Sequence, residues 1–183
     1  MTNIEILIPA EEISKRVKEL AAEISRDYAG KTITLICALK GAMFFVADLS
    51  REIQMVACPS INAQMLDVRL EFIKVSSYGN ASESSGKITL EYPETLDLKD
   101  KDVIIVEDIV DMGYTACWLK KYLQGFEPAS LKFCALLDKP SRRRADVDIE
   151  YLGFTVPNEF IVGYGLDYAQ KYRCLPYIGK VLE

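Results

Sequence analysis

Three acidic side chains follow a run of aliphatic residues near the middle of the 183-residue chain. The run, residues 103–106, reads Val-Ile-Ile-Val, and Glu107, Asp108 and Asp111 come after it. Adjacent carboxylates can accept hydrogen bonds from a vicinal diol such as the 2′ and 3′ hydroxyls of a ribose. Backbone N–H groups of a loop that opens a helix can hold a phosphate. The spacing therefore predicts a site for a ribose phosphate.

The elements around these acids must place them at one edge of a sheet. The aliphatic run predicts a strand that is buried on both faces and that ends before Glu107. Gly113 allows a tight turn, and from Thr115 onward apolar residues recur at helical spacing. In open α/β sheets the ligand crevice lies outside the carboxyl ends of the strands. We therefore expect the acids to line that crevice.

This stretch is similar to the phosphoribosyl pyrophosphate (PRPP) binding motif of type I phosphoribosyltransferases. Its Val-Glu-Asp-Ile-Val-Asp start resembles the hypoxanthine-guanine branch of the family. The resemblance implies that Asp111 is the catalytic base, which takes the proton from N7 of a purine. The implied ribose-phosphate contacts are Glu107, Asp108, Asp111, Met112, Gly113, Tyr114 and Thr115.

One position departs from the family pattern, which usually has threonine where this chain has Met112. In the family the threonine hydroxyl donates a hydrogen bond to the 5′-phosphate, whereas a thioether has no donor. We therefore expect the phosphate to be held by loop N–H groups, by Thr115 and by the Tyr114 hydroxyl.

Composition limits the class of protein. The length fits one domain over residues 1–183, and 50% hydrophobic with 27% charged residues is typical of a globular protein. A net charge of −5 argues against nucleic-acid and anionic-membrane partners, which require a basic face. The chain shows no targeting pattern and no apolar run that could span a bilayer, which predicts a cytoplasmic location.

Histidine is absent, which excludes histidine triads, histidine metal sites and histidine general bases. Acid–base chemistry must then fall to carboxylates, lysine or tyrosine. The five cysteines are scattered and form no C-x-x-C pair, which favours reduced thiols over a disulfide framework or a zinc site.

Two segments before the acids carry further candidates. Helical spacing predicts a covering helix over 9–30, and a buried strand over 32–38 leads into Lys40 and Gly41. The pattern alone supports two interpretations of Lys40 equally: a surface lysine beside a turn glycine, or a contact to phosphate. The family resemblance implies that this turn binds pyrophosphate.

The segments 67–72 and 87–92 alternate polar and apolar residues, which predicts two half-buried antiparallel strands. Residues 76–86 between them are small and polar, so we expect a mobile hairpin loop. By composition this is only a long loop. The resemblance implies that it closes over the site and that Ser77 and Tyr78 contact pyrophosphate.

The second half of the chain carries the residues that the resemblance assigns to the base. A buried strand over 130–137 leads to Lys139, which by pattern is a solvated lysine and by resemblance binds purine O6. The basic run 142–144 predicts a solvated loop. Phe160 and Ile161 would by default be core residues, whereas the resemblance places them against the purine. The implied purine contacts are Lys139, Phe160, Ile161 and Asp167.

The resemblance also implies a metal and a second pyrophosphate contact, Arg173. It implies Mg²⁺ near the carboxylates of Glu107, Asp108 and Asp167, because Mg²⁺ prefers oxygen ligands and usually binds together with substrate phosphates.

We expect an α/β fold of the type I phosphoribosyltransferase class. It has a central, mostly parallel twisted sheet flanked by helices, and a small hood made mainly of 150–183 with part of the N-terminus. The implied activity is transfer of the phosphoribosyl group of PRPP to N9 of hypoxanthine or guanine, in a homodimer or homotetramer. One alternative is a PRPP-sensing regulator that reuses the fold. Another is a receiver-like module, which would carry its acidic pair on the first strand.

Overall fold

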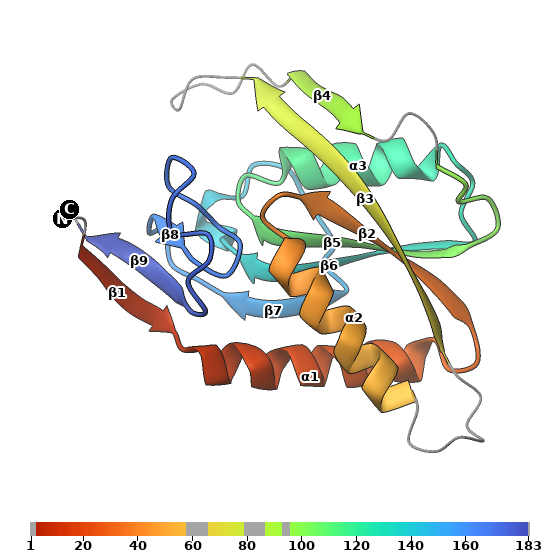
Figure 1. The fold of residues 1–183 in the computed structure, drawn as a ribbon. Helices are drawn as coiled ribbons and strands as arrows, with labels where there is room; N and C mark the ends of the chain where they lie inside the picture. Colours follow the sequence, from red (N-terminus) through yellow and green to blue (C-terminus); the bar gives the residue numbers. More distant parts are fainter. Residues whose placement is uncertain (1–2, 58–65, 79–86, 93–95, 183) are drawn as a thin grey trace.

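The computed structural model describes residues 3–57, 66–78, 87–92 and 96–182. This part of the chain forms a larger, mostly parallel central sheet, a smaller sheet beside it, and three α-helices (Figure 1). Side chains of residues 76–78 and 87–92 lie outside the description. That residues 1–183 form a single domain stays a prediction.

The larger sheet has the strand order β4-β3-β2-β5-β6-β7. Every neighbouring pair is parallel except β3 and β4, which are antiparallel, as the sequence predicts. The mostly parallel sheet confirms the expected fold class. Its strands are β2 (Thr32–Leu39), β3 (Asp67–Tyr78), β4 (Lys87–Tyr92), β5 (Asp102–Val110), β6 (Ser130–Asp138) and β7 (Tyr151–Thr155).

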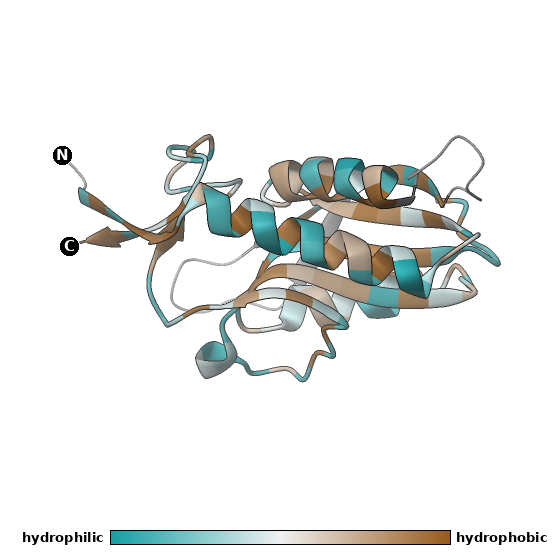
Figure 2. Cartoon of the chain, turned by 90° about the horizontal axis from the view of Figure 1, so that it is seen from below, coloured by the Kyte–Doolittle hydropathy of each residue, from teal (hydrophilic) through white to brown (hydrophobic). Residues whose placement is uncertain are grey.

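Helices cover both faces of this sheet. Alternate residues of β5 point to opposite sides, so Ile104 and Val106 pack with α1 and α2 while Val103 and Ile105 pack with α3. Seen from below, α1 shows alternating hydrophilic and hydrophobic bands in front of mostly hydrophobic strands (Figure 2). The helices are α1 (Ala10–Asp27), α2 (Met43–Ala57), α3 (Tyr114–Gln124) and the short 3₁₀ helix η1 (Pro140–Arg142).

Helix α1 confirms the predicted covering helix. Its acidic first turn, Glu11 and Glu12, suits the positive end of the helix dipole. The predicted apolar face is buried at every position: Ile13, Val17, Leu20, Ala21 and Ile24. None of the described helices has both the length and the apolar content that crossing a membrane requires.

The smaller sheet joins segments from the two ends of the chain. Its order is β1-β9-β8, with both pairs antiparallel. It contains β1 (Asn3–Ile8), β8 (Ile161–Val162) and β9 (Ile178–Leu182). The hood expected around residues 150–183 therefore includes a small sheet that needs β1, whereas β7 belongs to the larger sheet.

Two predicted boundaries differ from the structure. The β3 strand continues through 76–78, where the mobile loop was expected to begin, because these residues pair with 87–89 of β4. The rest of that loop, 79–86, lies outside the described residues. The second difference, at the end of β5, bears directly on the site.

Candidate functional site

Glu107 and Asp108 lie within β5, so the prediction that this strand ends before Glu107 is wrong. Pairing between β5 and β2 ends at Val106, opposite Cys37, whereas pairing with β6 continues to Val110, opposite Asp138. Beyond Val106, β5 pairs with β6 but no longer with β2. The two carboxylates therefore sit on a strand that is fixed on one side and open on the other.

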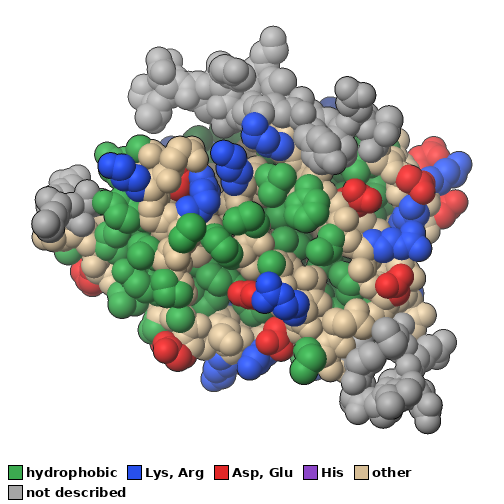
Figure 3. Space-filling model, in the orientation of Figure 1, with side chains coloured by type: hydrophobic (Ala, Val, Ile, Leu, Met, Phe, Trp, Pro, Cys, Tyr) green, Lys and Arg blue, Asp and Glu red, His purple; other side chains and the backbone are tan. Residues whose placement is uncertain are grey.

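A cavity of about 550 Å³ opens on that free side. Its lining contains three carboxylates that were predicted to lie near a metal, and two basic residues that were predicted to contact pyrophosphate. Figure 3 shows several Lys and Arg side chains in the upper left part of this face, beside the undescribed residues. The predicted site residues that line the cavity are Lys40, Gly41, Glu107, Asp108, Thr115, Asp167 and Arg173.

Two glycines let the walls of this cavity approach each other. A Cβ atom at Gly41 would lie 1.6 Å from Asp108 Oδ2, and a Cβ atom at Gly165 would lie 1.8 Å from the Gly41 carbonyl oxygen. Gly165 also has a φ of 111°, which favours glycine. The turn after β2, whose Leu39–Lys40 peptide is cis, thus packs directly between the acidic strand and the C-terminal loop.

Arg173 organises the C-terminal wall. Its guanidinium donates to the carbonyl oxygen of Gly165, and Nη2 lies 2.6 Å from Asp167 Oδ1. The other Asp167 oxygen accepts a hydrogen bond from the Gln170 backbone N–H at 2.8 Å. The described ranges contain no group of three or more His, Cys, Asp or Glu side chains that could hold a metal ion.

Burial disfavours the charged forms of the acidic pair. Burial raises the pKa of Glu107 well above its usual value, and the neighbouring charge of Asp108 raises it further. Burial also raises the pKa of Asp108, although a hydrogen bond from the Ile109 N–H at 2.9 Å and the charge of Arg173 act in the opposite direction. Hydroxyl donors or a cation at this point would relieve that cost.

The loop after β5 has the shape expected for a phosphate loop. Gly113, with a φ of 89°, leads into α3, which begins at Tyr114. Thr115 lines the cavity, so the first, unpaired N–H groups of α3 lie at its edge. A Cβ atom at Gly113 would lie 2.6 Å from the Ala145 carbonyl oxygen, which explains the glycine.

A second cluster lies on the other side of that loop. Lys139 is buried, and its Nζ donates to the Glu159 carbonyl oxygen at 2.7 Å. Burial lowers the pKa of Lys139, while the charge of Asp111 acts against that shift. Asp111 Oδ1 forms an ion pair with Arg142 Nε at 2.7 Å. The two groups are not aligned for a hydrogen bond, so this buried oxygen has no hydrogen-bond donor among the described residues. Lys139 is therefore not the solvated lysine that its pattern predicts.

The residues that were predicted to contact the purine do not all lie in one cavity. Ile161 is buried, as its default reading predicts, but Phe160 is 53% exposed and makes an edge contact with the Tyr168 ring, centroids 5.1 Å apart. Lys139, Phe160 and Ile161 do not line the carboxylate cavity. The prediction that Phe160 is a core residue is wrong, because this side chain lies where β8 begins and projects to solvent.

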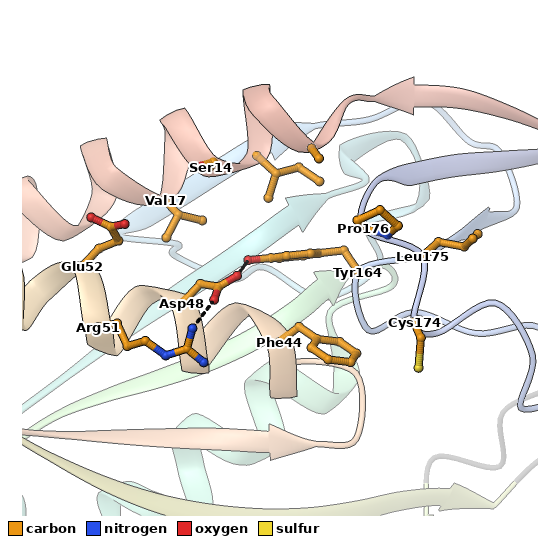
Figure 4. A pocket seen from close by; sticks show the side chains of 12 residues that line it. Ser14, Val17, Phe44, Asp48, Arg51, Glu52, Tyr164, Cys174, Leu175 and Pro176 are labelled. Atoms are coloured by element: carbon orange, nitrogen blue, oxygen red, sulfur yellow. Dashed lines mark hydrogen bonds and ion pairs between the residues drawn. The ribbon is translucent and has the colours of Figure 1, made fainter.

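A further cavity, of about 450 Å³, lies between α1, α2 and the C-terminal loop (Figure 4). In it the Tyr164 hydroxyl donates to Asp48 Oδ2 at 2.7 Å, and Asp48 Oδ1 pairs with Arg51 at 3.2 Å. Burial and the Asp48 charge raise the pKa of Tyr164, so its hydroxyl remains a donor. This bond anchors the turn whose Gly165 packs on Gly41.

Comparison with known proteins decides the family. A model of the phosphoribosyl transferase domain matches residues 4–169. The chain belongs to the phosphoribosyltransferase family. This phosphoribosyltransferase is 42% identical over 181 residues to the hypoxanthine phosphoribosyltransferase of Escherichia coli K12, with 98% of this chain and 96% of that protein covered.

Other relatives agree. The hypoxanthine-guanine phosphoribosyltransferase of Mycobacterium avium is 44% identical over 182 residues, which cover 96% of this chain and 84% of that protein. A crystal structure of a hypoxanthine-guanine phosphoribosyltransferase from Bacillus anthracis superposes with a TM-score of 0.88 at 46% identity, covering 98% of this chain and all of that one. The fold expected from the sequence is thus that of solved family members.

Several residues of the phosphoribosyltransferase site had no assigned role in the sequence. Gln170 lines the cavity, and Tyr164 anchors its wall. The basic run 142–144 is not simply a solvated loop, because Arg142 pairs with Asp111 and Arg143 pairs with Asp138. The only sign of this in the sequence was that the run is a cluster of basic residues in an acidic chain. The side chains of Ser77 and Tyr78, expected at pyrophosphate, lie outside the described part of the chain.

The raised pKa values of Glu107 and Asp108 yield a prediction for stability. A carboxylate whose pKa is higher folded than unfolded binds more protons in the folded state, so stability falls as pH rises through that window. Without ligand, we expect the melting temperature to fall as the pH rises from the usual carboxylate range, about 4, through the raised pKa values of the pair. Glu107→Gln combined with Asp108→Asn should flatten this slope and raise the melting temperature near pH 8.

The matched control is Asp146→Asn with Asp148→Asn, because both of these carboxylates are exposed and should leave the slope unchanged. Thermal scans of the three proteins at several pH values measure the effect. A double variant of the buried pair that melts below the parent near pH 8 would show that these carboxylates do not destabilise the ligand-free protein.

Proposed function

We propose that this phosphoribosyltransferase transfers the 5-phosphoribosyl group of PRPP to N9 of a 6-oxopurine, hypoxanthine or guanine, and releases pyrophosphate in purine salvage. The observation that carries the proposal is the cavity in which a buried acidic pair, a lysine turn and Asp167–Arg173 meet the start of α3. The names of the relatives support the base: they are hypoxanthine and hypoxanthine-guanine phosphoribosyltransferases.

We assign the ribose hydroxyls to Glu107 and Asp108, and the 5′-phosphate to the loop from Asp111 to Thr115. The acidic pair lines the open cavity, and two ribose hydroxyls would supply hydrogen-bond donors to it. The N–H groups at the start of α3 favour a phosphate by geometry and by the helix dipole. Thr115 of this loop lines the same cavity as the two carboxylates, which supports the binding of a single ribose phosphate there.

We assign pyrophosphate to Lys40, Gly41 and Arg173, with Ser77 and Tyr78 as further contacts. Lys40 and Arg173 supply positive charge to the lining of the cavity. Glu107, Asp108 and Asp167 line the same cavity but do not form a three-ligand metal site by themselves, so we propose that Mg²⁺ would bind near them together with pyrophosphate oxygens and water. When bound with pyrophosphate, it would neutralise the leaving group.

We assign the purine to Lys139, Phe160, Ile161 and Asp167, with Asp111 as the base that accepts the N7 proton. Lys139 is held beside Glu159, and its ammonium can donate to O6. The exposed ring of Phe160 is free to stack on a planar base. As pyrophosphate leaves, positive charge develops at C1′, so the protein acts mainly by positioning and by electrostatic stabilisation.

The other readings of the sequence gain no support. The relatives described above are named as transferases, which leaves a PRPP-sensing regulator without a supporting observation. The acidic pair lies on β5 rather than on the first strand, contrary to a receiver-like module. We further propose that the enzyme acts in the cytoplasm as a homodimer or homotetramer, without nucleic-acid or membrane partners, in keeping with its net charge of −5.

The proposed function is tested by a turnover assay. The purified enzyme is incubated with PRPP, Mg²⁺ and hypoxanthine, guanine or xanthine, and the product mass is measured. We expect a nucleoside monophosphate from hypoxanthine, guanine or both. Failure to form a nucleotide from any of the three bases would refute the proposal.

Replacing Asp111 by asparagine should lower kcat by about 10²- to 10⁴-fold, because an amide keeps the shape of the side chain but cannot accept a proton. The affinity for PRPP should change much less. Single-turnover kinetics and PRPP titration separate the two effects, with Asp146→Asn as an exposed control. An unchanged rate of the chemical step would remove Asp111 from the mechanism.

Met112→Thr should tighten PRPP binding, because it adds a hydroxyl donor next to the proposed 5′-phosphate, or leave it nearly unchanged where a water or a shifted backbone group already replaces that donor. A hydrogen bond to a charged group is worth about 1.5–3 kcal/mol, or roughly ten- to 150-fold in affinity if nothing already replaces it. Met112→Val is the matched control, since it has the shape of threonine without the hydroxyl. A threonine variant that binds PRPP about tenfold more weakly than the valine variant would mean that the phosphate lies elsewhere.

A further inference from the structure

The chain that follows Lys139 folds back over the phosphate loop. The side chain of Arg143 is only 18% exposed, and its Nη2 forms an ion pair with Asp138 Oδ1, whose side chain is 15% exposed. From another nitrogen, Nε, it donates to the Asp111 carbonyl oxygen at 3.3 Å. One guanidinium therefore joins the end of β6 to the start of the phosphate loop.

The backbone next to Arg143 fixes the same loop. The N–H groups of Arg144 and Ala145 both donate to the Met112 carbonyl oxygen at 3.0 Å. A Cβ atom at Gly113 would lie 2.6 Å from the Ala145 carbonyl oxygen and 3.0 Å from Arg143 Cδ. The left-handed turn at Gly113 is thus built against this segment.

The other end of the ion pair leads to the purine side. Asp138 precedes Lys139, the proposed contact to O6, and the Lys139 N–H donates to the Val110 carbonyl oxygen at 3.0 Å. The Asp138 carbonyl oxygen accepts the Val156 N–H at 2.9 Å, where the chain leaves β7 toward Phe160. Arg143 consequently stands between the segments that we assign to the two substrates.

We propose that Arg143 is a positioning residue that sets the shape of the 5′-phosphate loop and fixes it relative to Lys139. This inference rests on the proposed function. The guanidinium acts through the Asp111 carbonyl oxygen and the Asp138 carboxylate. Its two contacts use separate nitrogens of a rigid planar group, a geometry that a lysine ammonium cannot reproduce.

The variant Arg143→Lys tests the two contacts separately. Its ammonium keeps a positive charge beside Asp138 but loses the second donor to Asp111. We expect a melting temperature close to that of the parent, a Kd and a KM for PRPP raised roughly tenfold or more, and a purine KM that changes less. Arg143→Gln removes both contacts and should raise the KM for PRPP and for the purine together.

Arg144→Gln is the matched control. The Arg144 side chain is exposed and has no hydrogen bond or ion pair among the described residues, and its backbone N–H is unaffected by the change. PRPP is titrated by calorimetry in the presence of Mg²⁺, and thermal scans and steady-state kinetics are run on the same samples. The control should match the parent in all three measurements.

An Arg143→Lys variant that binds PRPP as tightly as the parent would overturn the inference. So would a lowered melting temperature with unchanged PRPP affinity in Arg143→Gln, because that result describes a purely structural ion pair. Absence of turnover in the parent would instead refute the proposed function. The PRPP titrations do not depend on turnover, so they still decide the role of Arg143 in shaping the loop.

Discussion

The site depends on a difference between the two neighbours of β5. On one side β2 stops pairing at Cys37, and on the other β6 continues to Asp138. Buried carboxylates are costly unless donors or cations reach them, and only the side left by β2 can admit a ligand. The position of the acidic pair, its raised pKa values and the place of the cavity all follow from where β2 turns away.

Close packing then limits how the rest of the cavity is built. Gly41 and Gly165 have no room for a side chain, so the turn after β2 lies directly between Asp108 and the C-terminal loop. The Tyr164 hydroxyl holds that loop to α2 through Asp48. Arg143 has a comparable place behind the phosphate loop. Gly165, Tyr164 and Arg143, which we assign to neither substrate, thus help to set the distances between the residues that we do assign.

The sequence alone predicts those features that depend on local patterns. The buried face of α1 follows from helical spacing, and the two-faced burial of 103–106 follows from its four aliphatic residues. The end of β5 could not be predicted, because it depends on pairing with β6 rather than on residues 107–110. Phe160 and Arg143 were misjudged for a related reason: residue type indicates core or solvent, whereas their burial depends on segments outside the local pattern.

The pairing of β1 with β9 has a consequence for folding of the enzyme. Asn3 pairs with Leu182, so the two strands of this pair lie far apart in sequence. Such a long-range contact adds loop-closure entropy and slows folding. The larger sheet uses strands between residues 32 and 155 and does not need this long-range pair. β9 lies between β1 and β8, so a chain cut before Ile178 would leave both strands without their shared partner, and the small sheet could not close.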